Sequence, residues 1–147
     1  MDARAVFDDL VRFETVLWNA VDARLAAEVD VSLGSFNVLL VVDETPACRV
    51  QDVAAALAIT VGGASQAVDR LERRGLCARR PNPADRRSSI VELTPSGQEL
   101  LDRGGAVFDR ELERLLVAPL AGSDLAQLGT ALATLRAAAT THPEESR

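Results

Sequence analysis

Apolar and polar positions alternate with helical periodicity over most of this chain. Between residues 6 and 29, polar side chains fall on one narrow stripe, and apolar side chains fill about two thirds of the helix circumference, against about 100° for an ordinary surface helix. The polar stripe consists of Asp8, Arg12, Thr15, Asn19 and Asp22. We therefore expect this helix to be buried on more than one side, with a second subunit supplying part of the cover.

Three shorter helices are predicted next. The first runs through 36–43, is capped by Ser32 or Ser35 and ends at Thr45–Pro46. The second spans 50–58, and the third spans 61–74. Thr60 is a favourable N-cap for the third helix, and Gly75 is a favourable stop after its last turn. Spacing places four of its residues inward, namely Val61, Ala64, Val68 and Leu71.

A β-hairpin follows the third of these helices. Residues 76–80 and 89–93 have the composition of short strands, and the intervening PNPAD sequence signals a turn. Thr94–Pro95 then begins a long helix through about residue 116, which Gly104–Gly105 is expected to bend. After a break at 119–123, a final helix carries a leucine seam. The expected fold is mainly α with a small β-hairpin.

The composition fits one globular domain and argues against a membrane protein, a metal-binding protein and an enzyme. The 147 residues are 48% hydrophobic, and no apolar run approaches the ~18 residues of a membrane span. The N-terminus lacks a signal-peptide pattern, so we expect a cytoplasmic protein without membrane contact. The single His142 lies in a polar tail, and Cys48 and Cys77 are isolated from one another. These features predict no metal site, no cofactor and no enzyme activity.

Charge is concentrated in one segment. All 16 basic residues are arginine, and seven of them lie within residues 70–89 against two acids, Glu72 and Asp85. The segment therefore carries +5 in a chain of net charge −6. A cationic block in an acidic protein indicates a surface that meets a polyanion, and DNA is the polyanion we expect.

The outward face of helix 61–74 has the chemistry for reading DNA. Ser65, Gln66 and Arg70 are candidate base readers, because glutamine pairs with adenine and arginine with guanine in the major groove. Asp69 is expected instead to form salt bridges with its neighbours Arg70 and Arg73. The remaining candidate DNA contacts are Thr60, Gly62 and Gly63 at the helix N-terminus, Arg73, and Arg86 and Arg87 in the hairpin turn.

These segments resemble a known family. The sequence VDRLERRGL followed by RRPNPADRRSSIVELTPSG is similar to the core of the MarR transcriptional regulators. The resemblance implies a winged helix-turn-helix fold, a homodimer and a pseudo-palindromic double-stranded DNA operator. It implies a single MarR-type domain over 1–147, with dimerisation helices at 5–30 and 95–141 and a DNA-binding lobe at 33–94. It also implies that Asp85 braces Arg87 across the wing.

Gly62–Gly63 depart from this resemblance. Two glycines in the first turn of the reading helix allow close backbone approach to phosphate but weaken any transfer of base contacts to those positions.

Three functions remain open at this point. The first is a repressor released by a small aromatic or anionic effector, with Arg12 and Trp18 on the first helix as candidate effector-binding residues. The second is a thiol-based redox sensor on the same scaffold that uses Cys48 or Cys77, in which Arg79 and Arg80 would lower the pKa of Cys77. Two small structural thiols are the favoured interpretation, because free cysteine is usually buried. The third is a winged-helix protein-interaction module that does not bind DNA.

Overall fold

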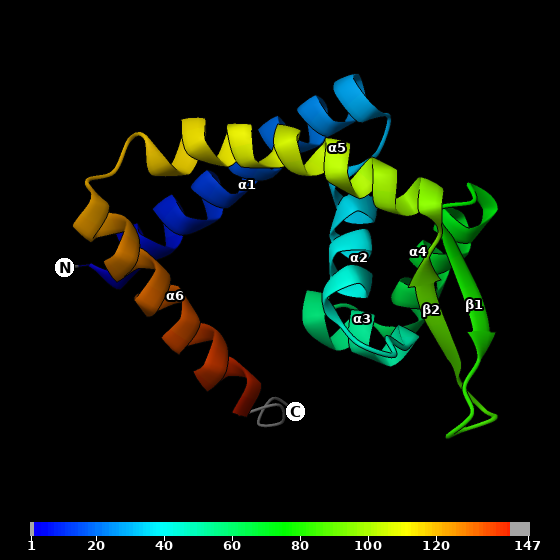
Figure 1. Cartoon of the computed structure of the whole chain (residues 1–147). Coiled ribbons are helices and arrows are strands. Elements are labelled where there is room, and N and C mark those ends of the chain that lie inside the picture. Colours follow the sequence, from blue (N-terminus) through cyan, green and yellow to red (C-terminus); the bar gives the residue numbers. More distant parts are fainter. Residues whose placement is uncertain (1, 142–147) are drawn as a thin grey trace. The chain divides into compact units, whose positions relative to one another are not determined.

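A computed structural model describes residues 2–141 and confirms a mainly helical chain with one β-hairpin (Figure 1). The chain forms two compact units, Met1–Asp109 and Arg110–Arg147, and each is described by itself. His142 lies outside the described residues. The elements are α1 (Ala3–Val29), α2 (Leu33–Glu44), α3 (Val50–Leu57), α4 (Val61–Arg73), β1 (Cys77–Pro81), β2 (Ser89–Leu93), α5 (Pro95–Leu112), the π-helix η1 (Glu113–Val117) and α6 (Gly122–Thr141).

The predicted helix boundaries are confirmed by their capping hydrogen bonds. Of the two candidate caps for α2, Ser32 takes the position, and its hydroxyl oxygen accepts from the Ser35 backbone N–H at 3.1 Å. The Thr60 hydroxyl caps α4 by accepting from the Gly63 N–H at 3.0 Å. Gly75 follows α4 at φ +72°, a left-handed conformation that glycine adopts without steric cost.

The hairpin is antiparallel, with Cys77 opposite Leu93 and Pro81 opposite Ser89. Its first strand begins one residue later than predicted. Leu76 does not start the strand because its N–H donates to the Leu71 carbonyl at 2.9 Å, which closes the end of α4.

The core of the first unit is built around α2, which packs against α1, α3, α4 and β2. Phe36 is fully buried at its centre, together with Leu25 from α1, Leu39 from α2 and Leu71 from α4. The Phe108 ring lies 5.3 Å from the Phe36 ring, centroid to centroid, and so joins α5 to the same core.

One prediction about burial is wrong. Val61 is 55% exposed rather than inward, because it is the first residue of α4 and lies beyond the stripe that contacts the core; Ala67 is buried on that stripe instead. In α1, the buried residues are Val21, Leu25 and Val29, all near its C-terminal end. The remaining apolar side chains of α1 include the exposed Val6, Phe7, Leu10, Val11, Phe13, Val16 and Trp18.

No single helix within the described residues is long and apolar enough to cross a membrane, and two bent helix pairs meet the length and composition criteria only when taken together.

Gly104 and Gly105 do not interrupt α5, which continues through both to Leu112. A Cβ atom on Gly104 would lie 2.7 Å from Cε2 of Phe36, whereas one on Gly105 would meet nothing within 4 Å. Gly104 therefore allows α5 to approach the Phe36 ring, which explains the glycine by packing rather than by a bend.

This difference yields a stability prediction. Gly104→Ala should lower the free energy of unfolding by about 1–3 kcal/mol, because the buried Phe36 ring has no free space into which to move. The matched control Gly105→Ala should raise it by up to about 1 kcal/mol through helix propensity. Denaturant unfolding at one fixed protein concentration measures both, and equal effects of the two substitutions would contradict the packing explanation.

Candidate nucleic-acid interface

The α4 helix divides into an inner and an outer face. Ala64, Ala67, Val68 and Leu71 are buried, and the opposite face carries the exposed Gln66, Arg70 and Arg73, with Ser65 half-buried beside them. The structure thus places the predicted base readers on the outer side of the helix. Thr60, Gly62 and Gly63 lie together at its first turn.

The seven arginines of the cationic segment separate into two groups. Three are engaged within the fold. Arg74 donates to the Asp30 carbonyl at 2.7 Å, Arg79 pairs with carboxylates of α4, and Arg80 pairs with Glu92 across the hairpin.

Within the described residues, the other four arginines have no carboxylate partner: Arg70, Arg73, Arg86 and Arg87. All four are exposed. These four guanidinium groups are therefore available to phosphate or to base edges.

Asp69 has a different partner from the one predicted. Its carboxylate lies 2.8 Å from Nη1 of Arg79 on β1, while Arg73 reaches only the Asp69 backbone carbonyl, at 3.4 Å. The prediction of ion pairs with Arg70 and Arg73 is wrong because the hairpin folds back along α4 and brings Arg79 to the acid. As a result, Asp69 does not neutralise the outer arginines.

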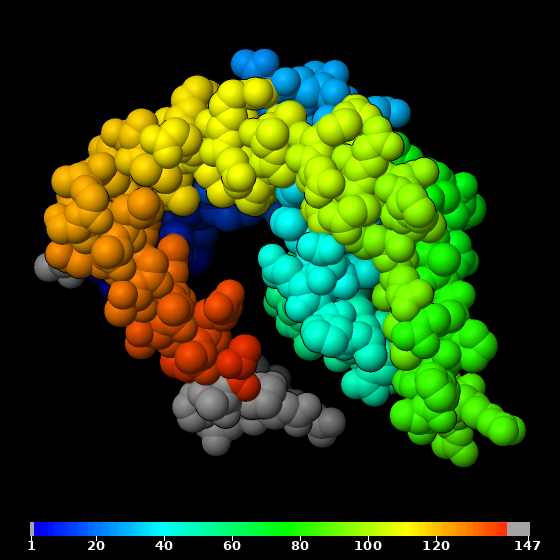
Figure 2. Space-filling view, viewed as in Figure 1, coloured from blue at the N-terminus to red at the C-terminus, as the bar shows by residue number. Residues whose placement is uncertain are grey.

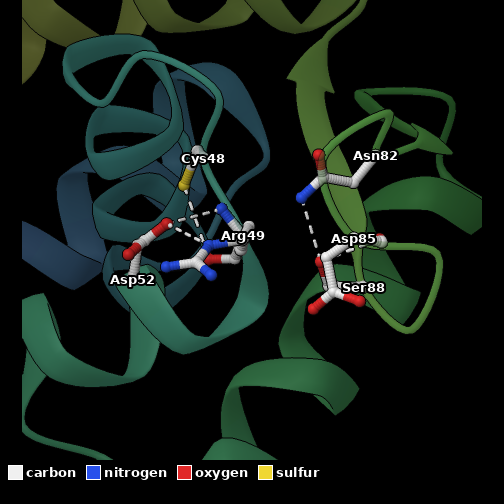
Figure 3. Close-up of polar contacts among 6 residues, drawn as sticks. All are labelled: Cys48, Arg49, Asp52, Asn82, Asp85 and Ser88. Atoms are coloured by element: carbon white, nitrogen blue, oxygen red, sulfur yellow. Dashed lines mark hydrogen bonds and ion pairs between the residues drawn. The ribbon is translucent and has the colours of Figure 1, made fainter.

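The turn between the strands is held by short-range polar contacts (Figure 3). The Asn82 side chain donates to the Ser88 hydroxyl at 3.0 Å and accepts from the Ala84 N–H at 3.0 Å. Asp85 accepts from the Arg87 backbone N–H at 2.9 Å, and no ion pair joins the two side chains within the part of the chain described. Asp85 thus braces the backbone of the turn and leaves the Arg87 guanidinium exposed.

The hairpin tip protrudes from the first unit in the space-filling view (Figure 2). At its base, a groove of about 240 Å³ separates the start of α3 from the hairpin, and Figure 3 shows the polar side chains on its two sides. Sequence reasoning missed four residues that line this groove, Arg49, Gln51, Ser88 and Ser89, alongside Ser65, Arg79 and Arg87. Of these four, only Arg49 had a sequence feature that could have identified it as a DNA contact, namely a basic side chain directly before a predicted helix.

A second groove, of about 290 Å³, lies on the same unit and has a mostly apolar lining. Trp18 of α1 forms one wall, α2 contributes Asn37 and Val38, and α4 contributes Gly63, Ala67 and Arg70. Arg12 does not line this groove; its guanidinium pairs with Asp8 at 2.8 Å on the exposed surface of α1. The structure therefore separates the two residues proposed for an effector.

Comparison with known proteins agrees with this geometry. A MarR family model matches residues 29–88. The HTH-type transcriptional regulator BilQ of Clostridium symbiosum is 28% identical over 105 residues, which is 71% of this chain and 72% of BilQ. The solved structure of the transcriptional repressor CouR is 31% identical, with a TM-score of 0.78 over 86% of this chain and 89% of that chain. The chain belongs to the MarR family.

A MarR family regulator from Streptomyces coelicolor shows the same fold at lower identity. Its structure matches with a TM-score of 0.85 at 24% identity, over 90% of this chain and 84% of that chain. Together with CouR, it confirms the winged helix-turn-helix prediction, in which α3 and α4 form the helix pair and β1–β2 the wing.

In this MarR protein, both cysteines are buried. Cys48 is 1% exposed and Cys77 is 2% exposed. Burial raises the pKa of the Cys77 thiol to about 11, with smaller contributions from Cys48 and Glu72, and these outweigh the lowering effect of Arg79. Burial likewise raises the pKa of Cys48. Both thiols are thus buried, as the favoured interpretation expects. The lowered Cys77 pKa of the redox alternative does not occur, because loss of hydration dominates over the nearby guanidinium.

A pH-dependent prediction follows from the thiols. The unfolded chain loses the Cys77 proton near its ordinary pKa of 9.0, whereas the native state keeps it until about 11. The native state thus binds more protons between these values, so the free energy of unfolding should fall as pH rises through this window. Denaturant unfolding at several pH values measures this fall, and Cys77→Ala should reduce it.

The native thiols should also react slowly with iodoacetamide at neutral pH. Rapid alkylation would contradict the assignment of buried, protonated thiols.

Proposed function

We propose that this MarR protein is a homodimeric transcriptional repressor that binds double-stranded DNA through α4 and the wing and is released by a small molecule. One observation carries the proposal: α4 and the hairpin turn present four exposed arginines that have no carboxylate partner within residues 2–141, while the neighbouring acids are occupied by other groups. The relative CouR supports it, because that protein is described as a transcriptional repressor bound to a 23-mer DNA duplex.

Each part of the surface has a distinct role in this proposal. Ser65, Gln66 and Arg70 meet base edges as α4 enters the major groove, and Arg73 meets the backbone. At the N-terminus of α4, Thr60 and the small residues Gly62 and Gly63 let phosphate approach the backbone of the first turn. Arg86 and Arg87 extend from the wing toward the minor groove, with Asp85 shaping the turn.

Dimerisation would cover the apolar surface that one chain leaves open. Phe7 is 66% exposed and Val16 is 57% exposed on α1, and Leu135 is 61% exposed on α6. Taken unit by unit, exposed apolar side chains of this size favour burial against another protein. We assign residues 5–30 and 95–141 to the dimer interface and residues 33–94 to the DNA-binding lobe. A two-fold dimer requires a pseudo-palindromic operator with half-sites about one helical turn apart.

The same proposal gives the protein a binding role rather than an enzymatic one. Within residues 2–141, no group of three or more His, Cys, Asp or Glu side chains is arranged to hold a metal ion. We place its action in the cytoplasm.

The effector part of the proposal rests on the groove beside Trp18. Its mostly apolar lining and the unpaired Arg70 at its α4 wall suit an aromatic molecule that carries an anionic group. Because Gly63, Ala67 and Arg70 belong to the reading helix, a molecule in this groove contacts the element that binds DNA. CouR supports a small-molecule effector, since CouR from Rhodococcus jostii is described as bound to p-coumaroyl-CoA.

The DNA-binding proposal predicts a salt-sensitive mobility shift with the DNA upstream of the protein's own gene. Affinity should fall by orders of magnitude between about 50 and about 200 mM salt, because several arginines per lobe release counterions from DNA. Arg87→Ala should weaken binding by about tenfold or more. Arg4→Ala removes the same charge from an exposed site at the start of α1, outside both the DNA-binding lobe and the assigned dimer interface, and serves as the control. If the wild type shifts neither this DNA nor a genomic pool, the protein-interaction module replaces the repressor.

The effector groove predicts a fluorescence signal, since Trp18 is the chain's single tryptophan. An aromatic carboxylate that enters the groove should change Trp18 emission and weaken operator binding over the same concentration range. Arg12→Ala should leave both responses unchanged, because Arg12 lies outside the groove. A ligand that releases DNA without altering Trp18 emission would place the effector site elsewhere.

A further inference from the structure

Arg79 of β1 makes an unusual set of contacts with the reading helix. Its Nη1 atom lies 2.8 Å from Asp69 Oδ1 and 3.3 Å from Glu72 Oε1, and its Nη2 atom donates to the Ser65 carbonyl at 3.4 Å. Its backbone N–H also donates to Glu72 Oε2 at 3.0 Å. One residue of the wing thus contacts two successive turns of α4 on the side that faces the hairpin.

The next residue along the strand provides a natural comparison. The side chain of Arg80 is 46% exposed and pairs with Glu92 on β2 at 2.6 Å, so it joins the two strands to each other. The side chain of Arg79 is 23% exposed and joins the hairpin to α4. Two adjacent arginines of equal charge therefore connect different parts of the fold: Arg80 links the two strands, and Arg79 links the hairpin to α4.

The base of the hairpin is also held by apolar packing, since Cys77 of β1 and Val91 of β2 are buried in the same core cluster as Val68 and Leu71 of α4. Further from that core, the position of the wing depends on the backbone and on Arg79. The chain passes from α4 to β1 through Gly75 at φ +72°, a residue with wide conformational freedom. A hydrogen bond of 2.7 Å from the Val91 N–H to the Cys48 carbonyl ties β2 to the loop before α3. Neither of these features joins a side chain of the wing to the outer part of α4, and the Arg79 contacts do so.

We propose that Arg79 is a positioning residue for DNA binding: its ion pairs with Asp69 and Glu72 hold the wing at a fixed distance from α4, so that both elements reach one operator together. This inference rests on the proposed function. The reading helix and the wing address different grooves, and a shift of the wing removes one set of contacts even when every DNA-contacting side chain is present.

The sign of a charge change tests this role. Glu72→Gln and Asp69→Asn each remove a negative charge close to the DNA-binding face, so electrostatics alone predicts tighter binding. The positioning role predicts the opposite, because each substitution breaks one of the ion pairs. We expect Arg79→Gln to weaken operator binding by roughly tenfold and Glu72→Gln to weaken it in the same direction, with Arg79→Lys restoring part of the loss.

Two further measurements separate positioning from a direct contact. Arg80→Gln removes the same charge from the neighbouring position and should have a much smaller effect on affinity. In Arg79→Gln, hydroxyl-radical protection of the minor groove at the wing should be lost, whereas protection of guanine N7 in the major groove should remain. Arg79→Gln should also add little to Arg87→Ala, since both substitutions remove the same wing contact.

The contrary results are equally clear. Wild-type affinity or tighter binding in Glu72→Gln, or losses that add fully between Arg79→Gln and Arg87→Ala, would overturn the positioning role and leave the repressor proposal standing. If the wild type binds no DNA, the repressor proposal fails. Amide hydrogen exchange of the free protein then still tests whether the Arg79 ion pairs hold the wing against α4. Exchange in β1 should rise in Arg79→Gln and Glu72→Gln but not in Arg80→Gln, at matched unfolding midpoints; unchanged exchange would refute it.

Discussion

Burial of one narrow face of α4 is the constraint on which the rest of this surface depends. Ala64 and Ala67 are small, so the helix lies close to its neighbours, and Val68 and Leu71 anchor it in the core that surrounds Phe36. Because the buried stripe is narrow, most of the helix circumference remains outside. The outer positions are then free of any packing requirement, and their side chains can be selected for contact with a ligand as large as DNA.

The placement of the acidic residues leaves the outer arginines of this surface available for a ligand. The chain has a net charge of −6, yet the acids nearest the cationic segment are engaged by arginines that serve the fold. Asp69 and Glu72 face Arg79, and Glu92 faces Arg80. Charge-assisted hydrogen bonds form most strongly with guanidinium groups that have no competing carboxylate. The acidic remainder of the chain also reduces attachment to DNA through other parts of its surface.

Local signals in the sequence predicted the helices and the hairpin well. They did not predict contacts between residues that lie far apart in the sequence. Thr60, Gly75 and Thr94–Pro95 mark helix ends through their own backbone chemistry, so the helix boundaries and the hairpin follow from short windows. The partner of Asp69 depends on how the hairpin folds back along α4, and no spacing rule contains that information.

The Cys77 thiol and Gly104 show the same limit. The raised pKa of Cys77 depends on burial by the whole lobe, and the role of Gly104 depends on a ring in α2. Within the described part of the cationic segment, by contrast, the four arginines without a carboxylate partner are all residues that sequence chemistry selected for DNA. The features that suit a side chain to phosphate also make it unsuitable for the interior.

The unpaired arginines have one more consequence. No lysine occurs among the 147 residues, so every basic side chain at this surface is an arginine. Lysine acetylation, which removes a positive charge, therefore has no target side chain here. Amine-directed cross-linkers likewise meet no side-chain amine. A device that weakens the hold of this surface on a polyanion has to act on something other than a lysine charge, and occupancy of the groove beside Trp18 is one route that the structure offers.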